Sequence, residues 1–138
     1  MLYSLALIII IFSQFFYSCG PGNDNLEPTL TGEKWRLVKI TARNKSEYII
    51  DKPGDYTLKL SDNGGLKVRS DCNKCSGEYT TASKFIKFKK LDCTKKFCGK
   101  ASQDFIFRKS LENASSFKLN KRKLTLGSYK STMEFSTE

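Results

Sequence analysis

The chain has 138 residues, 39% of them hydrophobic and 12% aromatic, and its 24 Lys and Arg against 14 Asp and Glu give a net charge of +10. This length allows one small domain with a modest hydrophobic core. The chain contains no histidine, which excludes Ser-His-Asp and Cys-His catalysis and any metal site that needs a histidine ligand.

Residues 1–18 are predicted to be a lipoprotein signal peptide. The chain opens with a run of mostly apolar residues, and its first charged side chain is Asp24. The run is shorter than the roughly 20 residues that a spanning helix needs, and Phe16-Tyr17-Ser18-Cys19 is similar to a bacterial lipobox. We therefore expect Cys19 to receive a lipid and to anchor the protein in the bacterial cell envelope, at the outer membrane.

Two alternatives to the lipid anchor stay open. All 24 Lys and Arg follow the apolar run, which favours an uncleaved membrane anchor because positive flanks tend to stay inside. The other alternative is a cleaved, soluble secreted protein.

Residues 19–30 are predicted to form a tether, and residues 31–138 a single domain. The tether is rich in Gly, Pro and Asn and has little to bury. The domain begins with a strand within residues 32–40 that contains Trp35, the only tryptophan, which we expect in the core.

Short runs in which apolar and polar residues alternate follow along the domain. They lie at residues 56–60, 66–69, 78–81, 85–91, 117–119, 124–126 and 133–135. The turn-forming segment Ser61-Asp62-Asn63-Gly64-Gly65 joins the first two of these runs into a hairpin.

One helix is predicted near residues 102–115. Phe105, Phe107 or Arg108, Leu111 and Ala114 recur at helical spacing, and Ser102 can cap the start of the helix. About seven short strands and one helix predict a mainly β, α+β fold. We expect an antiparallel sheet that is curled into a partly open barrel, with the helix covering an opening.

Four cysteines, Cys72, Cys75, Cys93 and Cys98, are predicted to form two disulfides. If residues 78–82 pair antiparallel with residues 84–88, the same register places Cys75 opposite Cys93 and Cys72 near Cys98. We prefer this nested pairing, Cys72 with Cys98 and Cys75 with Cys93, although the sequence leaves the other two connectivities open.

Two further interpretations of these cysteines stay open. Cys72-x2-Cys75 and Cys93-x4-Cys98 are separated as in a zinc ribbon, but the second pair is wider than the usual knuckle. Cys72 and Cys75 could also form a redox pair, but they lead into an expected strand rather than a helix N-terminus. An exported, oxidising location favours structural disulfides over both.

The basic charge favours anionic partners. The lysines are scattered, as at Lys84, Lys87, Lys118 and Lys123, which is typical of the solvent faces of strands and turns, and no nucleic-acid-binding motif is present. We expect the membrane as a partner through the N-terminal lipid, and either an anionic envelope component or another envelope protein as a partner of the domain. We expect no nucleic acid, no cofactor, no metal and no catalytic residue, because the few carboxylates are dispersed.

Several motifs of the domain match the pattern of one family. They are Gly32-Glu33-Lys34-Trp35-Arg36-Leu37, Cys72-Asn73 followed by Ser76-Gly77-Glu78-Tyr79, Thr94-Lys95-Lys96-Phe97-Cys98, Phe105 with Leu111, and Leu124-Thr125-Leu126. Through these motifs the chain resembles the META domain family, which includes the HslJ-like bacterial envelope lipoproteins. The resemblance implies a small, mainly β domain that is lipid-anchored or periplasmic, is often linked to stress or antibiotic responses and has no established catalytic site.

These observations predict a non-enzymatic cell-envelope lipoprotein that acts in the envelope stress response or binds an envelope component. Its interior is expected to be filled by Trp35, Phe85, Phe88, Phe105 and Leu111, whereas Asn73 and Gly77 are expected to be turn residues. Two alternatives stay open. A lipocalin-like carrier of a small apolar ligand would need an empty interior, and an inhibitor of a secreted enzyme would form a tight protein complex.

Overall fold

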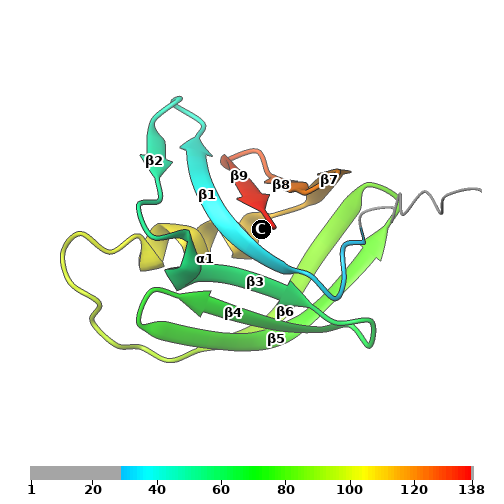
Figure 1. Ribbon diagram of the computed structural model, residues 1–138, viewed down its shortest axis with the longest axis horizontal. Helices are drawn as coiled ribbons and strands as arrows, with labels where there is room; N and C mark the ends of the chain where they lie inside the picture. The colour runs from blue at the N-terminus through cyan, green and yellow to red at the C-terminus, as the bar shows by residue number, and fades with distance from the viewer. Residues whose placement is uncertain (1–28, 138) are drawn as a thin grey trace, which may run out of the picture.

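The computed structural model describes residues 29–137, in which antiparallel strands and one α-helix form the domain (Figure 1). The strands are β1 (Lys34–Ala42), β2 (Glu47–Ile49), β3 (Tyr56–Leu60), β4 (Gly65–Ser70), β5 (Asn73–Ala82), β6 (Phe85–Cys93), β7 (Ser116–Asn120), β8 (Lys123–Gly127) and β9 (Ser131–Ser136). The helix α1 spans Asp104–Asn113, and a 3-10 turn, η1, spans Pro53–Asp55.

Part of the predicted N-terminal organisation lies outside the described residues. This applies to the signal peptide at residues 1–18, to the lipidation site Cys19 and to most of the tether at residues 19–30. No helix among residues 29–137 is long and apolar enough to cross a membrane.

The strands form one sheet that returns to its own beginning. They are hydrogen-bonded in the order β2-β1-β3-β4-β5-β6-β7-β8-β9, and β9 pairs with β1 as well. The pairing between β6 and β7 is the shortest in the sheet, because Phe85 opposite Ser116 is its one pair of partner residues. The predicted curled antiparallel sheet with one helix is therefore confirmed, and the return of β9 to β1 makes it a ring.

Large apolar side chains fill the interior of this ring. Trp35, Phe107 and Phe135 are at most 1% exposed, and the Phe107 ring lies 5.8 Å from the Tyr56 ring and 6.1 Å from the Phe135 ring. The buried indole N–H of Trp35 donates a hydrogen bond to the Leu30 carbonyl oxygen at 3.0 Å. An interior filled in this way suits a structural domain rather than a lipocalin-like carrier.

Two aromatic residues that we expected in the interior lie on the surface. Phe85 is 65% exposed and Phe105 is 69% exposed. Successive residues of a strand point to opposite faces, so Ile86 and Phe88 of β6 point inward and Phe85 points outward. On α1, Phe107 faces the interior. Phe105 lies two positions earlier and is therefore turned by about 200° around the helix axis, toward the surface.

The helix is shorter than predicted, although Ser102 contacts its first turn as expected. It starts at Asp104 rather than near residue 102, and the Ser102 hydroxyl accepts a hydrogen bond from the Asp104 N–H at 3.1 Å. Its buried face packs against β4, β6 and β9. A hydrogen bond of 3.1 Å from the Asn73 amide to the Asp104 carboxylate places the first turn of α1 beside the start of β5.

The hairpin of β5 and β6 contains a bulge at Gly77, where the register shifts between Ser76 and Glu78. A Cβ atom at position 77 would lie 2.9 Å from the Lys89 carbonyl oxygen and 3.1 Å from that of Lys90. Gly77 is therefore a strand residue required for a close backbone approach, rather than the turn residue that we expected.

Candidate functional site

The four cysteines of the domain lie in two disulfides. Cys72 is bonded to Cys98, with their Cα atoms 5.5 Å apart, and Cys75 is bonded to Cys93, with their Cα atoms 4.0 Å apart. Cys75 and Cys93 are direct cross-strand partners of β5 and β6. These are the two pairs of the nested arrangement, and they leave no thiolate of this cluster for a zinc site or a redox pair.

Asn73, which we expected in a turn, is instead a fully buried residue at the start of β5. Its side-chain carbonyl oxygen accepts hydrogen bonds from the Thr94 hydroxyl and the Lys96 N–H, each at 2.8 Å. Its amide nitrogen donates to the Lys96 carbonyl oxygen at 3.0 Å and to the Asp104 carboxylate at 3.1 Å. One side chain therefore ties the segment after β6 and the start of α1 to β5.

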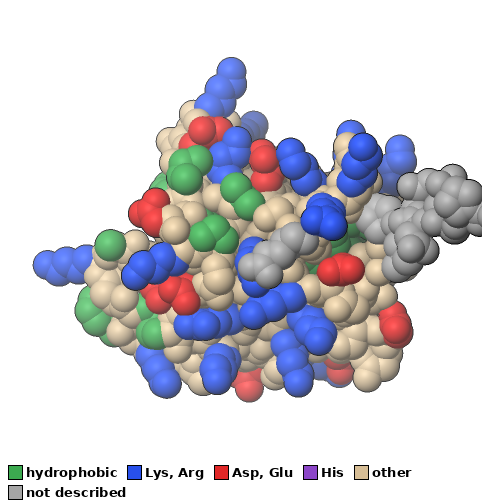
Figure 2. All heavy atoms as spheres, in the orientation of Figure 1, with side chains coloured by type: hydrophobic (Ala, Val, Ile, Leu, Met, Phe, Trp, Pro, Cys, Tyr) green, Lys and Arg blue, Asp and Glu red, His purple; other side chains and the backbone are tan. Residues whose placement is uncertain are grey.

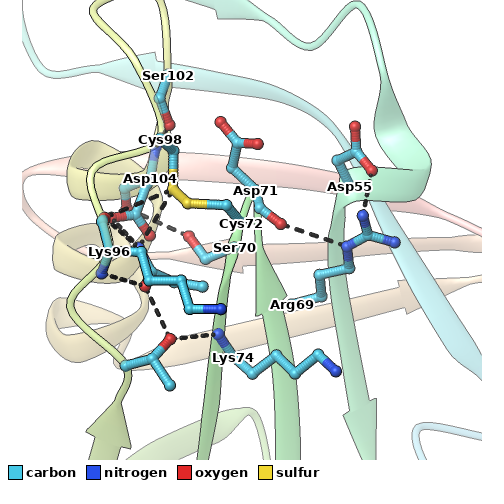
Figure 3. The surroundings of a disulfide bond; sticks show 12 residues. Asp55, Arg69, Ser70, Asp71, Cys72, Lys74, Lys96, Cys98, Ser102 and Asp104 are labelled. Carbon is cyan, nitrogen blue, oxygen red and sulfur yellow. Dashed lines mark hydrogen bonds and ion pairs between the residues drawn. A yellow bond between two sulfur atoms is a disulfide. The ribbon is translucent and has the colours of Figure 1, made fainter.

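Asp104 completes this polar cluster as a buried carboxylate with a cationic partner. Its two oxygens accept hydrogen bonds from Arg108 Nε at 2.9 Å and Arg108 Nη2 at 2.8 Å. Burial alone would raise the pKa of Asp104, but the hydrogen bonds and charge of Arg108, with hydrogen bonds from Ser70 and Asn73, hold the pKa below its usual value. Figure 3 shows Asp104 and Lys96 grouped around the disulfide of Cys72 and Cys98.

No carboxylate or cysteine cluster of the described residues has the composition of a metal site. Among residues 29–137, no group of three or more His, Cys, Asp and Glu side chains could hold a metal ion. A pocket of about 330 Å³ beside Cys98 contains Asp55 and Asp71, but both are engaged. Asp55 lies 2.7 Å from Arg69, and Asp71 accepts a hydrogen bond from the Tyr56 hydroxyl at 3.2 Å.

A larger groove lies on the outer face of the sheet, and we call it the basic groove. It has a volume of about 580 Å³ and crosses β1, β3, β4, β5 and β6. Its lining residues are Lys34, Thr57, Lys59, Lys67, Val68, Arg69, Lys74, Cys75, Ser76, Asp92, Cys93 and Thr94. The lining thus contains five cationic side chains and one carboxylate. Figure 2 shows a band of Lys and Arg over β3, β4 and β5, which Figure 1 labels.

The cations of the basic groove are aligned by the strand register. Lys34 lies directly opposite Lys59, and Lys59 lies directly opposite Lys67, which makes a row of three lysines across three strands. Arg69 and Lys74 are also direct neighbours in the row beside it. Like charges directly opposite each other destabilise a sheet, so this arrangement favours a bound anion.

Few of these charges are neutralised within the domain. Arg69 is paired with Asp55 at 2.7 Å. Lys34, Lys59, Lys67 and Lys74 have no ion pair among the described residues, and Asp92 is the one acidic residue of the lining. The basic groove therefore has the charge, size and exposure to hold an anionic group.

The basic groove is not among the sites predicted from the sequence, although the sequence contains a signal for it. We noted lysines on other segments, such as Lys87 and Lys118, which are exposed as expected. Lys59 and Lys67 were available as outward positions of two successive expected strands, and the hairpin register already places Lys59 opposite Lys67. Lys74 lies before the strand expected at residues 78–81, because β5 begins earlier than predicted. Lys34 joins them only through the pairing of β1 with β3, which the local pattern does not contain.

The comparisons with known proteins agree on the fold. A family model described as META domain matches residues 28–138. The structure is similar to the NMR structure of a protein from Burkholderia xenovorans, with a TM-score of 0.67 and 20% sequence identity, covering 79% of this chain and 83% of that chain. It is also similar to the crystal structure of a DUF4847 family protein from Bacteroides vulgatus ATCC 8482, with a TM-score of 0.61 and 13% identity, covering 82% of this chain and 97% of that chain. The comparison with curated proteins found no match.

Proposed function

Because the chain belongs to the META domain family, we propose that it is a non-enzymatic lipoprotein of the bacterial cell envelope that binds an anionic envelope component in its basic groove. The proposed anchor is a lipid on Cys19, and the proposed binding part is the domain at residues 31–138. The ligand would carry phosphate or carboxylate groups and would lie outside the ring, since the interior is filled by side chains.

The observation that carries this proposal is the row of Lys34, Lys59 and Lys67. Adjacent strands lie about 4.8 Å apart, so the bases of these three side chains are held at close, regular spacing. Folding gains nothing from placing like charges opposite each other, whereas a ligand with two or more negative charges would contact several of these lysines at once. Binding would therefore relieve a repulsion that the folded domain contains by itself.

The test uses the full-length chain, purified in detergent. Inorganic pyrophosphate and a polyuronic acid are titrated into it separately, and calorimetry measures the binding. The triple variant K34Q/K59Q/K67Q should weaken binding by about tenfold or more, because charge contacts to the ligand are lost. The control K87Q/K118Q/K123Q removes the same number of charges from exposed positions away from the groove and should bind like the parent chain.

Equal weakening in both triple variants would mean that the ligand responds to net charge alone and would refute a groove site. Absence of binding by the parent chain to either probe would refute the proposed anionic ligand. A further measurement is the dependence of binding on ionic strength. Binding through exposed lysines should weaken as salt screens their charges.

A further inference from the structure

The segment between β6 and α1, residues 94–103, is exposed and basic, and it contains one large apolar side chain, Phe97. It reads Thr-Lys-Lys-Phe-Cys-Gly-Lys-Ala-Ser-Gln, with three lysines and no carboxylate. Phe97 is 84% exposed, the highest value among the exposed large hydrophobic side chains of the described residues. We call this segment the Phe97 loop. Only its first residue, Thr94, lines the basic groove.

The backbone on both sides of Phe97 is held in place. The Lys96 N–H and carbonyl oxygen are both hydrogen-bonded to the buried side chain of Asn73, at 2.8 Å and 3.0 Å. On the other side, Cys98 is fixed to Cys72 by a disulfide. Ordering a residue costs backbone entropy, so a loop that is already ordered loses less when it binds a partner.

The chemistry of the Phe97 loop fits the surface of a bilayer. An exposed aromatic ring can enter the boundary between headgroups and acyl chains while neighbouring lysines contact the phosphates. Lys95, Lys96 and Lys100 provide these cations around Phe97. A protein partner is less suited, since a specific protein interface buries about 800 Å² on each side, and the loop around Phe97 is polar or small.

We propose that the Phe97 loop is a membrane-contact site, in which Phe97 inserts into an anionic bilayer and Lys95, Lys96 and Lys100 bind its phosphate groups. The proposal does not depend on the ligand of the basic groove. Figure 1 shows the loop at the end of the molecule opposite to the point where the described chain begins. A chain that is anchored at its N-terminus would then be held at both ends and would lie along the membrane.

The test places a tryptophan reporter at position 97 of the full-length chain and reconstitutes the chain in vesicles. In the F97W variant, vesicles that contain phosphatidylglycerol with brominated acyl chains should quench the added fluorescence by about twofold, because bromine quenches a ring that enters the acyl region. Zwitterionic phosphatidylcholine vesicles with the same brominated chains should quench it much less. Trp35 is fully buried, so its fluorescence serves as a constant background.

The matched controls are the F85W and F105W variants, whose parent side chains are 65% and 69% exposed at other places on the surface. Their fluorescence should change little in either kind of vesicle. Adding K95Q/K96Q/K100Q to F97W should abolish the difference between the two lipids, whereas adding K34Q/K59Q/K67Q should leave it intact.

The proposal would be overturned by quenching of F97W no stronger than that of F85W, or by equal quenching of F97W in both kinds of vesicle. Loss of quenching on changing the groove lysines, with the loop lysines intact, would move the membrane contact to the basic groove. The ring of Phe97 is on the surface, so F97W should keep the thermal midpoint of the parent chain, and a lowered midpoint would show that the residue serves folding instead.

Discussion

At the scale of single residues, the domain depends on a small polar cluster rather than on its aromatic core alone. Asn73 has its hydrogen-bonding groups satisfied by Thr94, Lys96 and Asp104. Among the described residues, no buried side-chain nitrogen or oxygen lacks a hydrogen-bond partner. Satisfied networks of this kind specify one arrangement of the elements that they join, because every alternative leaves a buried polar group unpaired.

The first prediction concerns the acid stability that Asp104 provides. Its pKa is lowered in the folded state from an ordinary value of 3.8, so the stabilisation is fully present above that value and is lost as the pH falls through the folded-state pKa. The D104N variant should be less stable than the parent chain by about 2 kcal/mol near neutral pH, because it breaks a largely buried ion pair.

Urea unfolding at several pH values measures this effect. The difference in free energy of unfolding between parent and D104N should shrink as the pH falls below about 4. The control E112Q removes an exposed carboxylate from the same helix and should change little at neutral pH. A difference between parent and D104N that stays constant down to about pH 2 would show that the Asp104 charge contributes nothing.

The second prediction concerns Gly77. The G77A variant should lower the free energy of unfolding by about 2 kcal/mol, because the new methyl group would meet two backbone carbonyl oxygens that cannot move without disrupting β6. The matched control is G54A, since nothing lies within 4 Å of a Cβ atom at position 54. Thermal melts of the two variants should differ clearly, and similar melts would mean that the bulge adapts to a side chain.

At the scale of elements, hairpins are the features that the sequence predicts best. The alternation in β5 and β6 and the short turn between them were enough to place Cys75 opposite Cys93, because a hairpin register follows from local residues. The orientation of Phe85 and Phe105 was wrong, since hydrophobicity was counted without keeping to one face of the strand or helix. The three-residue β2 was missed because its run is too short for a pattern.

The third prediction separates the roles of the two disulfides. Removing either one should cost about 2–4 kcal/mol of stability. Only the C72S/C98S variant should also speed hydrogen exchange at the Lys96 amide, because Cys98 ends the segment that Asn73 holds. In the C75S/C93S variant, exchange at the Lys96 amide should speed up no more than the loss of global stability explains. Equal exchange in the two variants would mean that Asn73 orders the loop without help from the disulfide.

The fourth prediction concerns the lysine row. The K67E variant should gain about 0.5–1 kcal/mol of stability at low salt, because it replaces a repulsion with Lys59 by an attraction. The control K87E makes the same change of charge opposite Thr80, where no lysine faces it. Urea midpoints at low and at about 1 M salt measure the effect, which should vanish at high salt. Equal gains in both variants would attribute the effect to net charge alone.

At the scale of the whole molecule, the arrangement of the strands is what the sequence could not supply. The pairing of β1 with both β3 and β9 joins segments that are distant along the chain, and no local pattern encodes it. The basic groove follows from this pairing, since Lys34 reaches Lys59 only when β1 lies beside β3. The local pattern therefore predicts a curled sheet and the lysine pair of the β3–β4 hairpin, but not the addition of Lys34 that completes the row.

The return of β9 to β1 also determines when the domain can form. Ala42 at the end of β1 pairs with Ser131 at the start of β9, so the ring cannot close until β9 is in place. Pairing between such distant segments makes folding slow, on the order of milliseconds to seconds. Until then the edges of β1 and β8 can pair with another chain, so the docking of β9 sets the moment at which the folding domain ceases to expose these two edges.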